Sequence, residues 1–89
     1  MTATPKNWHI VDNKLELKLE FANHLELAGF LVKLIILSEK YNHHPECYFN
    51  YKKLVIKLYT HSENRITDKD YELAEKINLL LKEDSRDIS

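Results

Sequence analysis

Two adjacent histidines, His43 and His44, precede a proline in the stretch EKYNHHPE and are the side chains best suited to chemistry. Imidazole accepts and releases protons near neutral pH, so a histidine pair can serve as general acid and base. On a helix, Glu39 would lie one turn before His43, where its carboxylate can hold an imidazole N–H. The stretch is therefore either a site for proton transfer or a solvated helix end.

Three further residues could belong to the same site. His61 ends an alternating apolar pattern, and it can join the pair only if that strand ends beside the helix. Asp70 could belong to a site, but it also completes a capping-box pattern that begins at Thr67. Trp8 could line a pocket or lie in the core. A zinc site built from three histidines is another interpretation, although the sequence offers no obvious fourth ligand.

The strands that must position these residues follow from alternating hydrophobicity. Residues 14–21 place apolar side chains on one face and charged side chains on the other, which predicts a half-buried antiparallel strand. Asp12 and Asn13 suit a tight turn, so residues 8–11 are predicted as its hairpin partner. Two more strands are predicted, at residues 47–51 and 54–61.

Two helices complete the predicted order. Asn23 can cap a helix that extends to about Tyr41, because Pro45 disfavours helical geometry in the residue before it. A second helix starts at the capping box and should bury one stripe of residues: Tyr71, Ala74, Ile77, Leu80 and Leu81. Residues 82–89 are polar and are predicted to fray. The order strand, strand, helix, strand, strand, helix predicts one α+β domain over residues 1–89, with helices packed on one face of a four-stranded antiparallel sheet.

Composition narrows the class of protein. Hydrophobic residues make up 44% and charged residues 30% of the chain, which is typical of a globular domain. The net charge of −1 indicates no basic face, so we expect no direct nucleic-acid partner. The longest apolar run, residues 34–37, is too short to span a bilayer, and residues 1–6 lack the apolar core of a signal peptide. A single cysteine, Cys47, cannot form an internal disulfide, so we expect a soluble cytoplasmic protein.

The first predicted helix, over residues 23–41, is apolar around most of its circumference. One sheet cannot cover so much apolar surface in a small domain, which favours a subunit interface. We expect a homo-oligomer, dimer or tetramer, formed through this helix or through a sheet edge.

The spacing of the candidate residues resembles the signature of the pterin-4a-carbinolamine dehydratases. The matching positions are Glu39, His43, His44, Pro45, Tyr51, His61 and Asp70. The resemblance also covers Trp8, the strand at residues 15–21 and the Thr60-His61 pair, so it spans nearly the whole chain. The family's fold, helices on one face of a four-stranded antiparallel sheet, agrees with the predicted order of elements.

This resemblance implies dehydration of 4a-hydroxytetrahydropterin to quinonoid dihydropterin, the recycling step that follows aromatic amino acid hydroxylases. It implies that no metal or cofactor is required. The implied catalytic residues are His43, His44 and His61. Glu39 would orient His43 or contact the pterin ring. Thr60 and Asp70 would support both His61 and the pocket, and Trp8 would form a wall of the pocket.

The chain also departs from the family pattern. Cys47 stands where tryptophan is common and Phe49 where asparagine is common. Residues 62–66 replace a glycine-rich turn, in which Asn64 could adopt the left-handed conformation. Some relatives act as dimerisation partners of a transcription factor or assist enzyme assembly. An interaction protein that uses the apolar helix, in the nucleus if it acts as a coactivator, is therefore the alternative function.

Overall fold

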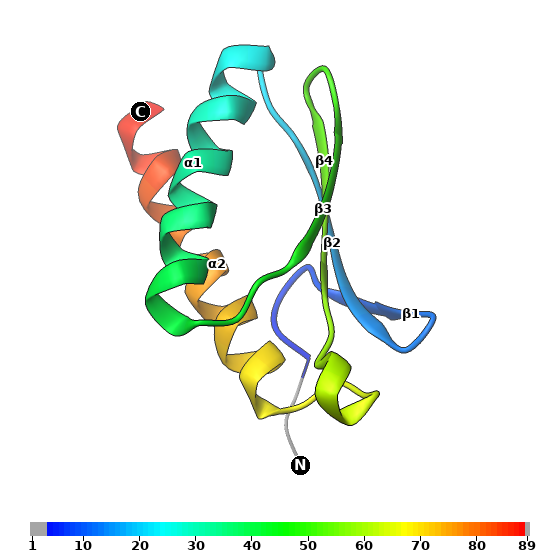
Figure 1. The fold of residues 1–89 in the computed structure, drawn as a ribbon. Helices are drawn as coiled ribbons and strands as arrows, with labels where there is room; N and C mark the ends of the chain where they lie inside the picture. Colours follow the sequence, from blue (N-terminus) through cyan, green and yellow to red (C-terminus); the bar gives the residue numbers. More distant parts are fainter. Residues whose placement is uncertain (1–3, 89) are drawn as a thin grey trace.

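The computed structural model describes residues 4–88, and the side chains of residues 4–83. Its helices and strands follow the predicted order (Figure 1). They are β1 (His9–Val11), β2 (Lys14–Glu20), α1 (His24–Tyr41), β3 (Glu46–Asn50), β4 (Lys53–Leu58), a short 3-10 helix (His61–Glu63) and α2 (Asp68–Ile88). The backbone of α2 is helical through Ile88, and Ser89 lies outside the described residues, so fraying of residues 82–89 stays a prediction.

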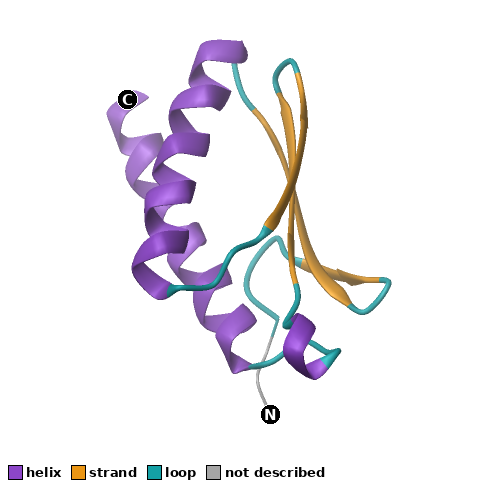
Figure 2. Cartoon of the chain, viewed as in Figure 1, coloured by secondary structure: helices purple, strands orange, loops and turns teal. Residues whose placement is uncertain are grey.

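The four strands form one antiparallel sheet in the order β1-β2-β4-β3, and both helices lie on one face of it (Figure 2). The α+β fold is therefore confirmed. Asp12 and Asn13, with φ of 51° and 64°, form the tight turn that joins β1 to β2. Strand β4 ends at Leu58, three residues earlier than predicted, and Thr60 then makes an isolated bridge to Arg65. The Asn64 that follows the 3-10 helix adopts the left-handed conformation, as predicted.

The core lies between the sheet and the helices. Alternation in β2 and β4 places their apolar residues on this side, and the helices contribute one stripe each. The fully buried members are Leu15, Leu17, Leu54, Ile56, Leu58, Leu27, Phe30, Leu34, Leu73, Ala74 and Ile77. Each side chain of Leu or Ile size contributes about 1.5–3 kcal/mol by its burial. The predicted stripe of α2 omitted Leu73, and three of its members, Tyr71, Leu80 and Leu81, are only partly buried.

Trp8 belongs to this core, because only 3% of its surface is exposed. Its indole Nε1 donates to Asn78 Oδ1 at 2.9 Å, and Asn78 Nδ2 donates to the carbonyl of Lys6 at 3.2 Å. These bonds fasten the N-terminal segment to α2. The structure thus gives Trp8 its packing role, and a role as a wall of the pocket stays a prediction.

The ends of α1 decide where the histidine pair lies. Asn23 caps the helix as predicted, with its side chain accepting from the backbone N–H of Glu26 at 2.9 Å. At the other end Asn42 takes a left-handed conformation, with φ of 51°, and its N–H donates to the carbonyls of Ser38 and Glu39. The chain therefore turns sharply one residue before His43, and both histidines lie outside the helix.

The outer side of α1 is apolar and exposed. Leu25, Val32, Ile35 and Ile36 all point away from the core, with Leu25 82% exposed. The sequence predicted this excess of apolar surface. No helix among the described residues is long and apolar enough to cross a membrane.

Candidate functional site

The most buried part of the candidate site is an imidazole–carboxylate pair. His43 Nε2 lies 2.5 Å from Asp70 Oδ1, and Asp70 is fully buried whereas the His43 side chain keeps 15% of its surface exposed. The other carboxylate oxygen accepts from Thr60 Oγ1 at 2.7 Å and from the Thr67 N–H at 2.9 Å. Both carboxylate oxygens of Asp70 thus have hydrogen-bond partners, which compensates the cost of burying the group.

This pairing sets the tautomer of His43. A carboxylate only accepts, so the ring donates through Nε2–H and its Nδ1 remains to accept a proton. The capping box also operates here, since Asp70 Oδ2 accepts from the Thr67 N–H at the start of α2. The Thr67 hydroxyl instead shares a hydrogen bond with Thr60 Oγ1 at 2.7 Å, which extends the network to the end of β4.

The second histidine has a different carboxylate. His44 Nε2 lies 2.5 Å from Glu39 Oε2, and both side chains are largely exposed. The expectation that Glu39 orients His43 is therefore wrong in this structure. The left-handed turn at Asn42 takes His43 out of helical register, so the four-residue spacing no longer brings its ring to Glu39.

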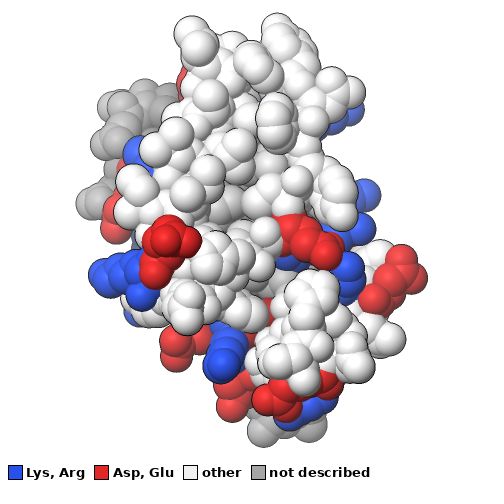
Figure 3. Space-filling model, viewed as in Figure 1, with Lys and Arg blue, Asp and Glu red and all other residues white. Residues whose placement is uncertain are grey.

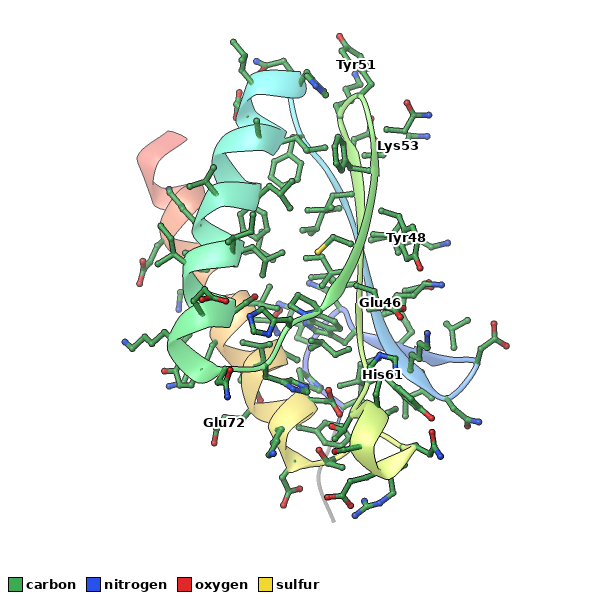
Figure 4. The ribbon with its side chains drawn as sticks, in the orientation of Figure 1. Glu46, Tyr48, Tyr51, Lys53, His61 and Glu72 are labelled. Carbon is green, nitrogen blue, oxygen red and sulfur yellow. The ribbon has the colours of Figure 1, made fainter. Side chains whose placement is uncertain are left out.

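The third histidine directly follows Thr60 of the Asp70 network, but its ring is turned to the other face of the sheet. His61 Nε2 is 3.7 Å from Glu46 Oε2, and its ring makes an edge contact with Tyr59 at 5.1 Å between centroids. Figure 4 shows His61 and Glu46 on the side of the sheet away from the helices. Thr60 and Asp70 were expected to support His61, but Thr60 bonds to Asp70 and Asp70 bonds to His43. Alternation along the chain turns Thr60 toward α2 and His61 away.

The carboxylate beside His61 also forms an ion pair with a lysine. Lys14 Nζ donates to Glu46 Oε1 at 2.9 Å, and this bond holds the pKa of the Glu46 carboxyl below its usual range and raises the pKa of Lys14. Charged side chains gather around this end of the molecule, whereas the surface beside the N-terminal half of α1 is mostly uncharged (Figure 3). Because the pKa of Glu46 is lowered and that of Lys14 is raised, both side chains are ionised at neutral pH.

A hollow of about 270 Å³ opens beside His43, between the end of α1 and the start of α2. Its lining residues are Tyr41, Asn42, His43, Lys69, Glu72 and Leu73. Sequence reasoning missed Lys69 and Glu72, which face the hollow only because α2 packs beside the end of α1. Spacing gave one usable signal, since both flank Asp70 within one helical turn.

Two side chains that departed from the family pattern also have defined positions. Cys47 lies on the helix side of β3 opposite Ile56, where burial raises the pKa of its thiol, so its thiolate is disfavoured. Phe49 is 53% exposed near the tip of the β3–β4 hairpin, where its ring lies 6.4 Å from that of His24. Neither contacts the histidine pair in any described interaction. Within the described residues, no cluster of three or more His, Cys, Asp or Glu is placed to hold a metal.

Three imidazoles, His43, His44 and His61, thus each lie beside their own carboxylate. His43 faces α2, whereas His61 is turned to the face of the sheet without helices, and the hollow beside His43 is lined by neither His44 nor His61. Such a set can move protons, since each carboxylate orients a ring and compensates the charge of its protonated form. An α+β domain that carries imidazole–carboxylate pairs is the class of protein that the fold and the side chains define.

Comparisons with known proteins give the family. The family model described as "Pterin 4 alpha carbinolamine dehydratase" matches residues 1–80, and the chain belongs to that family. Two relatives are both named "Putative pterin-4-alpha-carbinolamine dehydratase". The one from Prochlorococcus marinus (strain MIT 9515) is 41% identical over 71 residues, 80% of this chain and 74% of the relative. The one from Sulfolobus acidocaldarius is 38% identical over 73 residues, 82% of this chain and 80% of the relative.

Solved structures agree on the fold. A transcriptional coactivator/pterin dehydratase from Brucella melitensis superposes with a TM-score of 0.79 and 31% identity, covering 84% of this chain and 82% of its own. A pterin dehydratase-like protein identified as a RuBisCO assembly factor gives a TM-score of 0.72 at 20% identity, covering 85% of this chain and 90% of its own. The second likeness shows the fold alone.

Proposed function

We propose that this chain catalyses loss of water from a 4a-hydroxytetrahydropterin, giving quinonoid dihydropterin in the recycling of tetrahydrobiopterin. The observation that carries the proposal is the buried pair of His43 and Asp70, which leaves one imidazole nitrogen fixed in position and free to accept a proton. Membership of the family supports the same reaction.

The reaction needs two proton transfers. The C–O bond to the departing hydroxyl breaks as that hydroxyl takes up a proton, and the neighbouring ring nitrogen loses one, so water leaves with no net change in protons. We assign the ring-nitrogen proton to His43 Nδ1. His44 and His61 are more exposed and exchange protons with water, which suits them to supply the departing hydroxyl. Each transfer would contribute about 10²–10⁴-fold to the rate.

The remaining candidate residues would act through the histidines. Asp70 would hold His43 and is itself held by Thr60, and Glu39 would hold His44. The proposal requires no metal and no cofactor, because imidazoles alone can carry both protons.

The test is the rate at which enzymatically generated 4a-hydroxytetrahydropterin loses water, followed by ultraviolet absorbance. Wild type should accelerate the loss, and His43→Ala should remove most of the acceleration. His9→Ala is the matched control, since His9 is an exposed histidine on β1 that belongs to no part of this site. Equal rates for well-folded wild type and His43→Ala would contradict the proposal.

We further propose that the chain forms a homo-oligomer in the cytoplasm, through α1 or through a sheet edge. The exposed side chains of Val32, Ile35 and Ile36 on α1 support this, because apolar side chains gathered on one helix face mark an interface. Light scattering coupled to gel filtration should give a mass above the monomer, and Ile35→Glu should lower it. A monomeric wild type would refute the proposal.

The same apolar face favours a second candidate function, that of an interaction protein. The chain would then bind a different protein through α1, as a coactivator in the nucleus or as an assembly factor. A stable hetero-complex that is lost in Ile35→Glu, together with absence of dehydratase activity, would favour this candidate over the enzyme.

A further inference from the structure

His61 and three neighbouring side chains contact one another in a closed cycle, called here the contact cycle. Its members are Lys14, Glu46, His61 and Tyr59. Lys14 on β2 donates to Glu46 on β3 at 2.9 Å, and Glu46 Oε2 lies 3.7 Å from His61 Nε2. The His61 ring meets Tyr59 edge-on at 5.1 Å, and Lys14 Nζ lies over the Tyr59 ring at 5.6 Å from its centroid. Each of the four side chains thus contacts two others, which closes the contact cycle.

Sheet register explains why these residues meet. Glu46 is paired with Lys57, and Leu15 with Leu58, so Lys14, Glu46 and Tyr59 all point to the face without helices. His61 follows β4 by a short loop and ends on the same side, as Figure 4 shows for His61 and Glu46. Lys14 begins β2, one of the two central strands, so it links these contacts to the middle of the sheet.

The contact cycle selects one position for the His61 side chain, which the rest of its surroundings would leave undetermined. The His61 side chain is 69% exposed, and it lies in a short 3-10 helix rather than in a strand. A side chain this exposed has several rotamers of similar energy unless specific contacts select one. Glu46 supplies a charged contact on one side of the ring, and Tyr59 supplies an aromatic contact on the other.

We propose that Glu46 is a positioning residue for His61. Lys14 holds the Glu46 carboxylate, and that carboxylate orients His61 Nε2 and keeps the imidazole in contact with the Tyr59 ring. The proposal rests on the proposed dehydratase function, to which it adds a residue outside the histidine signature. Glu46 does not touch the substrate in this account and acts only through His61.

The test compares Glu46→Gln with Glu20→Gln. The control removes a carboxylate from an exposed ion pair with Lys52 on the same sheet face, remote from His61. Glu46→Gln should lower kcat about tenfold with little change in KM, because it loses part of one acid–base contribution and no substrate contact. Lys14→Met should act in the same direction, and Glu20→Gln should leave both constants unchanged.

Proton NMR of the His61 ring gives a readout that does not depend on activity. The ring protons lie in the magnetic field of the Tyr59 ring, so their chemical shifts report whether the contact persists. Assignment follows from the signals missing in His61→Gln. We expect these signals to move in Glu46→Gln and to stay in place in Glu20→Gln.

Unmoved His61 signals in Glu46→Gln would overturn the proposal, and so would moved signals with an unchanged kcat. An inactive wild type would instead refute the dehydratase, and a positioning role in that reaction with it. Moved signals in that case would show only that Glu46 places the ring, so the two failures are distinguishable.

Discussion

Asp70→Asn is the sharpest test of the His43–Asp70 pair, because it keeps the shape of the side chain and changes its hydrogen-bonding pattern. Asn has one accepting oxygen and one donating nitrogen. The oxygen can remain with Thr60 and Thr67, which both bond to Oδ2, and the nitrogen would then face His43 Nε2. His43 must respond by moving its proton to Nδ1.

Asp70→Asn therefore turns His43 Nδ1 from a proton acceptor into a donor, while residue 70 keeps the same number of hydrogen bonds. Nδ1 would carry a proton and could no longer accept one, so a base contribution of about 10²–10⁴-fold should disappear from kcat. The three bonds lose their charge assistance, which should destabilise the fold by about 1–3 kcal/mol. This loss is small enough for the protein to remain folded at room temperature.

The assay is the dehydration rate measured beside a urea unfolding curve for the same preparation. Thr60→Val is the control, since it removes one donor to Asp70 but leaves the bond to His43 in place. We expect it to destabilise the fold by about 1–2 kcal/mol with less than a tenfold loss of kcat. A folded Asp70→Asn protein with the wild-type kcat would refute the tautomer argument.

Three further predictions concern stability. The contribution of the Lys14–Glu46 pair should be full above the ordinary pKa of a glutamate, because the folded pKa of Glu46 is lowered, and should fade as acid protonates it; urea unfolding of wild type and Glu46→Gln should then converge at low pH. Asn42→Ala should destabilise the fold by about 1–2 kcal/mol because φ is 51°, whereas Asn42→Gly should be near neutral; equal stability of the two would contradict the strain argument. Ile56→Ala should lower the free energy of unfolding by about 2–5 kcal/mol, since Ile56 is fully buried at the centre of the sheet; a loss below 1 kcal/mol would show that the core collapses to fill the space.

The fold was predictable because its signals are local. Period-two alternation defined β2 and β4, and Asp12-Asn13 has the chemistry of the turn that joins β1 to β2. Asn23 and Pro45 bracketed α1 correctly, since capping and the restriction before proline each act within a few residues.

The pairing of the histidines was not predictable from spacing. The expectation that Glu39 would hold His43 assumed that the helix continues. The left-handed residue Asn42 ends it instead, so that Glu39 pairs with His44 and His43 pairs with Asp70. A similar limit applies to Glu46, which reaches His61 only through the pairing of β3 with β4. Local sequence carries propensities for elements, whereas these contacts arise from how the elements meet.

Asp70 joins parts of the chain that are far apart in sequence, and this has a consequence for how the molecule opens and closes. Its donors are His43, 27 residues earlier, Thr60, ten residues earlier, and the backbone of Thr67. A form in which the hairpins are paired but α2 is undocked would separate Asp70 from both His43 and Thr60, so the geometry of the pair cannot exist in that partly folded state. Activity should accordingly disappear in the same unfolding transition as the core.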